Sequence, residues 1–121
     1  MNKLLLIIDD QPLYLNSLAM ALKKKFEVST AANYDSALKE LEKGPDLALI
    51  DIRLDENDDR NIDGLKILEW IKINRPSIIS FVMSAYKEFS YAEQALNLGA
   101  RHFFKKPIDI MDLIAVLQEK G

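Results

Sequence analysis

The sequence contains no cysteine, one histidine, four glycines and four prolines, and its apolar residues never form a long uninterrupted run. The absence of cysteine excludes disulfide bonds, thiolate metal ligands and a cysteine nucleophile. The single histidine, His102, cannot supply the several imidazole ligands of a histidine-based zinc centre. No apolar stretch approaches the roughly 18 residues that a membrane-spanning helix needs, so we expect no membrane segment.

The charge balance and the N-terminus exclude further classes of protein. Nineteen acidic and 16 basic residues give a net charge of −3, which argues against non-specific nucleic-acid binding because such binding needs a basic surface. Lys3 and the apolar residues 4–8 look like the start of a secretory signal. This run is shorter than a signal-peptide core and ends in Asp9 and Asp10 instead of small residues. We therefore expect a cytoplasmic protein.

The length and composition are those of one ordinary globular domain. The chain has 121 residues, of which 49% are hydrophobic and 29% are charged. A chain of this length can bury one α/β core, but it is too short for a second independent domain. We expect a single domain over residues 1–121, with no separate output domain.

Apolar runs and helical patterns alternate along the whole chain. Strands are expected at residues 4–8, 26–30, 47–50, 78–83 and 102–104. Helices are expected from residue 12 to about 25, between Asn33 and Gly44, between Gly64 and Pro76, and over residues 89–98 and 109–119. This alternation predicts an α/β fold with a parallel sheet, helices on both of its faces and right-handed crossovers.

Polar side chains follow four of the expected strands. Asp9 and Asp10 follow the first strand, Asp51 the third, Ser84 the fourth and Lys106 the fifth. The carboxyl ends of parallel strands lie at one edge of the sheet, where doubly wound folds bind ligands. Three carboxylates at one place repel each other unless a cation joins them, and Mg²⁺ or Mn²⁺ suits such hard oxygen ligands.

A divalent cation with a lysine and a hydroxyl is the equipment for phosphoryl transfer. The cation and the Lys106 ammonium would neutralise the oxygens of the moving phosphoryl group, and Ser84 would donate a hydrogen bond to one of them. Asp51, at the end of the central strand, is the natural nucleophile and would form an acyl phosphate.

Five separated motifs in this order resemble the receiver domain of two-component response regulators. The motifs are Asp9-Asp10, residues 47–51, Ser84-Ala85, Gly99-Ala100 and residues 103–107, and they span essentially the whole chain. The resemblance implies a flavodoxin-like (βα)5 fold with a five-stranded parallel sheet of order 2-1-3-4-5.

The same resemblance implies a phosphoacceptor and a metal site. Asp51 would accept a phosphoryl group from a phosphohistidine of a partner kinase. Asp9, Asp10, Asp51 and the main-chain carbonyl of Arg53 would hold Mg²⁺, with Mn²⁺ as the alternative ion. The chain would then be a signalling switch that assists its own phosphorylation and dephosphorylation, and would turn over no separate substrate.

The resemblance further implies a switch and a set of partners. Lys106 would pair with the phosphoryl group, Ser84 would hydrogen-bond it and swing inward, and Phe103 would occupy the aromatic switch position. The bond between Lys106 and Pro107 would be cis. The implied partners are a sensor histidine kinase or phosphotransfer protein, a downstream effector protein or domain, and a second copy of the chain in a phosphorylation-dependent homodimer.

The sequence departs from the family pattern after the acceptor. Asp55 stands where the family usually has a proline, and the acidic insertion at residues 55–63 is several residues longer than the usual loop. Asp55, Asn57 and Asp59 have the opening spacing of a calcium loop, but Arg60 and Lys66 occupy its required glycine and glutamate positions. We therefore reject an EF-hand and expect a solvated, charged insertion, with an acidic rim that slows anionic phosphodonors as the alternative hypothesis. Phe103 also replaces the commoner tyrosine.

Three other functions compete with the phosphorylated switch. A receiver-like interaction module that works without phosphorylation would need neither Asp51, Ser84 nor Lys106. A phosphohydrolase with an acyl-phosphate intermediate usually carries a second aspartate two residues after its nucleophile, where this chain has Arg53. A nucleotide-binding flavodoxin-like protein is disfavoured because neither a G-x-G-x-x-G motif nor a P-loop is present.

Overall fold

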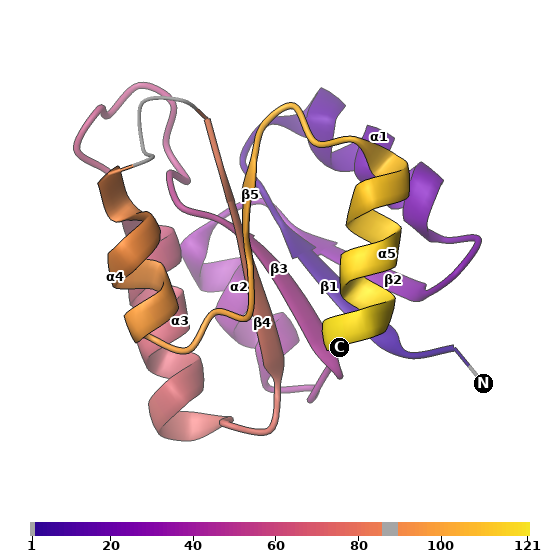
Figure 1. Cartoon of the computed structure of the whole chain (residues 1–121). Coiled ribbons are helices and arrows are strands. Elements are labelled where there is room, and N and C mark those ends of the chain that lie inside the picture. The colour runs from indigo at the N-terminus through magenta and orange to yellow at the C-terminus, as the bar shows by residue number, and fades with distance from the viewer. Residues whose placement is uncertain (1, 86–89) are drawn as a thin grey trace.

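The computed structural model of the chain describes residues 2–85 and 90–121. Its centre is a five-stranded parallel sheet of order β2-β1-β3-β4-β5, with β3 in the middle (Figure 1). The strands are β1 (Leu4–Ile8), β2 (Glu27–Ala31), β3 (Leu47–Asp51), β4 (Ile79–Ser84) and β5 (Phe103–Lys105). The predicted flavodoxin-like sheet, including its strand order, is confirmed.

Five helices cover the two faces of the sheet. They are α1 (Pro12–Leu22), α2 (Tyr34–Leu41), α3 (Asp63–Asn74), α4 (Ala92–Asn97) and α5 (Ile110–Lys120). Helices α1 and α5 lie against one face, and α2, α3 and α4 lie against the other (Figure 1). Within the described part of the chain, no helix is both long and apolar enough to cross a membrane.

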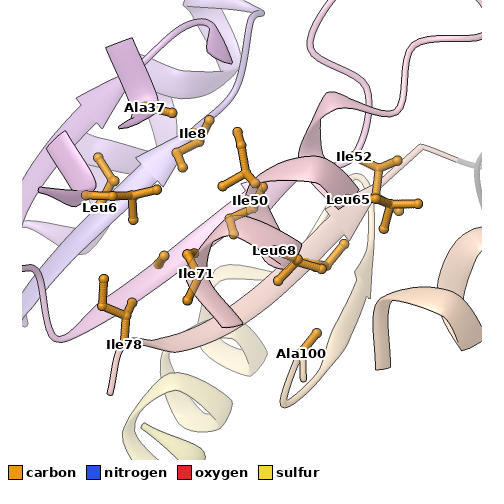
Figure 2. Packing of buried hydrophobic residues seen from close by; sticks show 14 of the residues in the cluster. Leu6, Ile8, Ala37, Ile50, Ile52, Leu65, Leu68, Ile71, Ile78 and Ala100 are labelled. Carbon is orange, nitrogen blue, oxygen red and sulfur yellow. The ribbon is translucent and has the colours of Figure 1, made fainter. Parts of the chain in front are cut away.

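Side-chain alternation along the strands divides the core in two. Leu6 and Ile8 pack with α2 and α3 (Figure 2), whereas Leu5 and Ile7 pack with α1 and α5. Successive residues of a strand point to opposite faces of the sheet, and helices cover both faces. All four side chains are therefore fully buried. From Leu5 to Ile8, the continuous apolar run is therefore a strand that is covered on both faces, whereas Leu4 is exposed.

The helix boundaries differ from the expected ones at several ends. Helix α1 ends at Leu22, and the lysines at residues 23–25 lie in the turn that follows, where the Lys25 N–H donates to the Leu22 carbonyl. The expected start of the fourth helix at Phe89 lies outside the described residues, and α4 runs from Ala92 to Asn97. The expected N-cap of α2 is present, because the Asn33 side chain accepts from the Ser36 N–H at 2.8 Å.

Gly64 lies inside the first turn of α3, and the expectation that it precedes the helix is wrong. Its N–H donates to the Ile52 carbonyl at 2.8 Å. A Cβ atom at this position would lie 2.1 Å from the Asp51 carbonyl oxygen, so only glycine lets α3 start this close to the end of β3. The position of α3 is thereby fixed against the backbone that carries Asp51.

Candidate functional site

The carboxyl ends of β1, β3 and β5 bring three charged side chains together. Asp9 follows β1, Asp51 ends β3 and Lys106 follows β5. The Lys106 Nζ atom lies 2.7 Å from Asp9 Oδ2 and 3.1 Å from Asp51 Oδ2. Asp9 is fully buried and Asp51 is 5% exposed. The ammonium therefore bridges two carboxylates between neighbouring strands, at the topological switch point of the sheet.

Asp10 adds a third carboxylate to the group. Asp9, Asp10 and Asp51 each place one carboxylate oxygen within 4.8 Å of the others. Asp10 Oδ2 accepts a hydrogen bond from the Glu56 N–H at 3.0 Å, whereas Asp10 Oδ1 is buried without a partner among the described residues. A buried, unpaired oxygen beside two further carboxylates fits a hard divalent cation such as Mg²⁺.

A small pocket of about 40 Å³ opens beside these carboxylates. Its lining includes Arg53, which follows β3, and Ala85, which follows β4. The full lining is Asp10, Gln11, Asp51, Arg53, Glu56, Ala85 and Lys106.

The peptide bond between Lys106 and Pro107 is cis, as the resemblance implied.

Burial and like charge govern the electrostatics of the site. Burial raises the pKa of the Asp51 carboxyl to about 8, with Lys106 opposing the rise and Asp9 and Asp10 adding to it. Burial alone would lower the pKa of Lys106, but the charges and hydrogen bonds of Asp51 and Asp9 raise it above its ordinary value. Lys106 is therefore charged at neutral pH, and a single ammonium faces three carboxyl groups.

Ser84 and Phe103 lie on neighbouring strands beside this group. Ser84 ends β4, is fully buried, and its hydroxyl donates to the Ala85 carbonyl at 3.0 Å. Phe103 pairs with Val82 in the β4–β5 register and packs, half-buried, against the core beneath α3 and α4. Ser84 and Val82 point to the same face of the sheet because they are two residues apart. Ser84 and Phe103 thus occupy the same face, one pleat apart.

The acidic insertion folds back over the pocket. Asn61 links the two ends of the insertion, because Asn61 Oδ1 accepts from the N–H groups of Leu54 and Asp63, both at 3.0 Å. Glu56 contacts the site through its N–H, as described for Asp10, and its carboxylate accepts a hydrogen bond from Gln11 Nε2. Residues 55–60 are exposed, as expected for a solvated insertion, but this loop also touches a candidate metal ligand.

Three residues at the site were not predicted from the sequence. Gln11 donates its N–H to Asp9 Oδ1 at 2.9 Å, and Glu56 lies beside Asp10. The Lys106 Nζ atom lies 4.8 Å from the centre of the Tyr14 ring, in a cation–π geometry. Only their positions next to a motif or inside the insertion could have drawn attention to them, because no residue pattern marks these contacts.

Comparison with known proteins assigns the family. The family model described as the response regulator receiver domain matches residues 5–118. The photosynthetic apparatus regulatory protein RegA of Rhodobacter capsulatus is 30% identical, over 99% of this chain and 64% of RegA. Sporulation initiation phosphotransferase F of Bacillus subtilis is 33% identical, over 93% of this chain and 89% of that protein.

Solved structures agree with this assignment. A CheY-like response regulator receiver domain protein from Methanospirillum hungatei superposes with a TM-score of 0.88 at 30% identity, over 99% of this chain and 94% of that one. NtrX from Brucella abortus superposes with a TM-score of 0.85 at 30% identity, over 98% of this chain but only 26% of NtrX.

The share of each relative that is covered differs widely. The chain spans 64% of RegA and 60% of the acid tolerance regulatory protein ActR of Rhizobium meliloti, so these relatives extend beyond the matched region. The matched region itself runs through almost all of this chain and contains all of the sheet except Leu4, the first residue of β1. The chain therefore belongs to the family of response regulator receiver domains, the signalling domains of two-component systems.

Proposed function

We propose that the chain is a phosphorylation-dependent switch whose phosphoacceptor is Asp51. The observation that carries this proposal is the contact of one lysine, Lys106, with both Asp9 and Asp51, next to Asp10 Oδ1, which has no hydrogen-bond partner among the described residues. This arrangement offers a nucleophile, a fixed cation and a set of metal ligands within one small pocket. Those are the groups that phosphoryl transfer requires.

Asp9, Asp10, Asp51 and the main-chain carbonyl of Arg53 would hold Mg²⁺, and Mn²⁺ offers the same ligand preference. When bound, the cation supplies positive charge that neutralises the oxygens of the transferred phosphoryl group. Burial is the main cause of the raised pKa of Asp51, and the charges of Asp9 and Asp10 add to it. A bound cation would relieve that repulsion, which supports this assignment.

The transfer itself can be written for the residues of this chain. An Asp51 carboxylate oxygen attacks the phosphorus of a phosphohistidine on a sensor histidine kinase or phosphotransfer protein. The phosphorus–nitrogen bond breaks, and the departing imidazole keeps the electron pair and takes up a proton. Lys106 stays within reach of the phosphoryl oxygens, because its Nζ atom already lies 3.1 Å from Asp51 Oδ2.

The output change would begin at Ser84. Its hydroxyl donates to the Ala85 carbonyl, and an acyl phosphate on Asp51 would offer a charged acceptor that forms a stronger hydrogen bond. Phe103 lies one pleat away on the same face and would move into the space that Ser84 leaves. The affected surface would be α4, β5 and α5, read by an effector protein or domain or by a second copy of the chain.

The proposal treats residues 1–121 as one receiver unit without turnover of a separate substrate. The B. subtilis relative, of which this chain covers 89%, is named a phosphotransferase, which supports a receiver that acts in phosphotransfer. The effector is proposed by analogy with the longer regulators that the chain matches only in part.

Intact-protein mass spectrometry tests the proposal. The chain is incubated with acetyl phosphate and Mg²⁺, and we expect wild type to gain one phosphoryl group. Asp51→Asn should gain none, and neither should wild type in the presence of a chelator. Equal labelling of the variant would overturn the assignment of Asp51. No labelling of wild type by acetyl phosphate or by a phosphorylated kinase would favour an interaction module that works without phosphate.

A further inference from the structure

Among the described residues of the acidic insertion, Glu56 is the one that contacts Asp10 and lines the pocket. Its N–H donates to Asp10 Oδ2 at 3.0 Å, across 46 residues of sequence. Its carboxylate accepts from Gln11 Nε2, and Gln11 is itself fixed because its N–H donates to Asp9 Oδ1 at 2.9 Å. Gln11, which directly follows the two aspartates, therefore connects the insertion to the carboxylate pair.

This contact determines which oxygen of Asp10 remains available. The Glu56 N–H occupies Oδ2, and Oδ1 is left as the buried oxygen without a partner in the described part of the chain. A carboxylate with one oxygen held by a backbone N–H loses rotational freedom, so its second oxygen has a fixed direction. Such outer hydrogen bonds commonly orient metal ligands.

The other acids of the insertion have different partners. Asp55 Oδ1 accepts from the Asn57 N–H, and Asp58 Oδ1 accepts from the Arg60 N–H. Asp59 pairs with Arg53 at 3.1 Å. Of the acids in the loop, Glu56 is the one that lines the pocket. Burial raises the pKa of Asp10; the hydrogen bond from the Glu56 N–H opposes this rise, and the charges of Asp9 and Glu56 add to it.

We propose that Glu56 is a positioning residue for Asp10, held in place by Gln11, and that the insertion thereby strengthens divalent-cation binding. This inference rests on the proposed function, since it takes Asp10 to be a cation ligand. Two effects act in the same direction. The Glu56 N–H orients Asp10, and the Glu56 carboxylate adds negative charge at the mouth of the pocket.

Calorimetric titration with Mg²⁺ separates these two effects. Gln11→Ala removes the side chain that holds Glu56 without changing the net charge. We expect the dissociation constant to rise about tenfold, the low end of the range for residues that orient metal ligands. Glu56→Gln keeps an oxygen for Gln11 but removes the charge, so we expect a smaller rise that shrinks at high salt. Glu56→Ala loses both the oxygen that accepts from Gln11 and the negative charge, so it should weaken Mg²⁺ binding most.

The matched control is Asp58→Asn. It removes the same charge from the same loop and keeps an oxygen to accept from the Arg60 N–H, but Asp58 does not line the pocket. We expect its Mg²⁺ affinity to stay within about twofold of wild type, as for a screened exposed charge. Equal weakening by Asp58→Asn and Glu56→Gln would show that the Glu56 charge acts only as part of the total loop charge. Unchanged Mg²⁺ affinity in Gln11→Ala would overturn the positioning role.

A structural readout accompanies the titration. In the metal-free protein, hydrogen exchange at the Glu56 amide should be slow in wild type and in Asp58→Asn, and faster in Gln11→Ala, because the amide loses its hold on Asp10. Wild-type Mg²⁺ affinity in both Gln11→Ala and Glu56→Ala would overturn the inference. If Asp10→Asn then still loses Mg²⁺ binding, the proposed function stands. If Asp10→Asn also binds as wild type does, the proposed metal site fails as well.

Discussion

Two groups of acids lie near the same edge of the sheet, and their surroundings differ completely. Asp9 and Asp51 are buried and share one ammonium, that of Lys106. The acids of the insertion are exposed, and the Asp59 side chain, which pairs with Arg53, is 84% exposed. Exposed ion pairs contribute only about 0.2–1 kcal/mol because water and salt screen them. Buried carboxylates are screened far less, so their charges must be matched by a fixed partner.

The comparison shows how one residue type can serve two purposes in this molecule. The aspartates at the strand ends place negative charge in a buried site, and the single ammonium of Lys106 neutralises only part of it. Exposed loop acids are screened by water and salt, and we expect any effect of theirs to fall on the approach of charged molecules and not on the core. Glu56 is the exception, because it belongs to the exposed group by sequence and lines the pocket of the buried group.

The largest expected effect comes from removing the shared ammonium. Lys106→Ala leaves Asp9 and Asp51 buried without their partner, and we expect the metal-free free energy of unfolding to fall by about 3 kcal/mol. This is the low end for broken buried ion pairs, because Asp51 can take up a proton. Urea denaturation in a chelator measures the loss, and Mg²⁺ should restore part of it.

The control for this variant is Lys24→Ala, which removes an exposed lysine from the turn after α1. It should change the free energy of unfolding by less than about 0.5 kcal/mol. A loss of similar size in both variants would mean that the buried acids are no more dependent on a fixed partner than surface acids are.

Asp10→Asn should have opposite effects on metal binding and on stability. We expect Mg²⁺ affinity to drop at least about tenfold, because a charged ligand is lost. Burial raises the pKa of Asp10 in the folded state, so its ionised form opposes folding at neutral pH. The variant should therefore gain less than about 1 kcal/mol of metal-free stability at pH 7, since the group is partly solvated.

The stability difference between Asp10→Asn and wild type should depend on pH. An acid whose folded pKa is raised stabilises the fold at low pH, and this contribution is lost as the pH rises through the folded pKa. The gain in metal-free stability of Asp10→Asn should thus disappear in acid, where Asp10 of wild type is protonated in both the folded and the unfolded state. A gain that is unchanged between neutral and acidic solution would contradict the electrostatic explanation.

We expect a small free energy difference between the two conformations of the proposed switch at Ser84 and Phe103. Phe103 carries no hydroxyl, so its inward position needs no buried polar partner, and phosphate should bias a two-state equilibrium. NMR shifts upon addition of beryllofluoride, a phosphoryl mimic, should extend from Asp51 to Ser84, Phe103 and residues 92–97. Shifts confined to Asp9, Asp10 and Asp51 would show that the site does not communicate with α4.

The smallest effect should come from neutralising the exposed acids. Replacing Asp55, Glu56, Asp58 and Asp59 with their amides removes four charges beside the pocket. At Mg²⁺ concentrations that saturate both proteins, phosphorylation by acetyl phosphate, an anion, should become severalfold faster at low salt. The gain should shrink at high salt because the Debye length falls to about 8 Å at 0.15 M. Identical rates at both ionic strengths would leave the insertion without an effect on donor approach.

The sequence allowed the location of the site to be predicted more fully than its contacts. Alternating apolar and helical segments implied a parallel sheet, and any residue that follows a strand of such a sheet lies at one edge. That argument was sufficient to bring Asp9, Asp51 and Lys106 to one place before any distance was known. The bridging geometry of Lys106 could not be derived, because it depends on side-chain packing between residues 97 positions apart.

Local features that depend on close approach were also missed. Gly64 resembled a helix-opening glycine, whereas its role is to let α3 contact the Asp51 carbonyl, which only the folded backbone reveals. The insertion resembled a solvated loop because its composition is polar, and composition carries no information on which of its acids folds back. Glu56 and Asp10 are 46 residues apart, and no periodicity connects them.

The most direct test of the central claim is to locate the phosphoryl group among all the aspartates near the pocket. After incubation with acetyl phosphate and Mg²⁺, borohydride reduction converts an acyl phosphate to homoserine, and peptide mass spectrometry identifies its position. We expect homoserine at position 51 alone, because Asp51 combines burial at the end of the central strand with contact to Lys106. Homoserine at Asp9, at Asp10 or at the exposed Asp55, Asp58 or Asp59 would contradict the account.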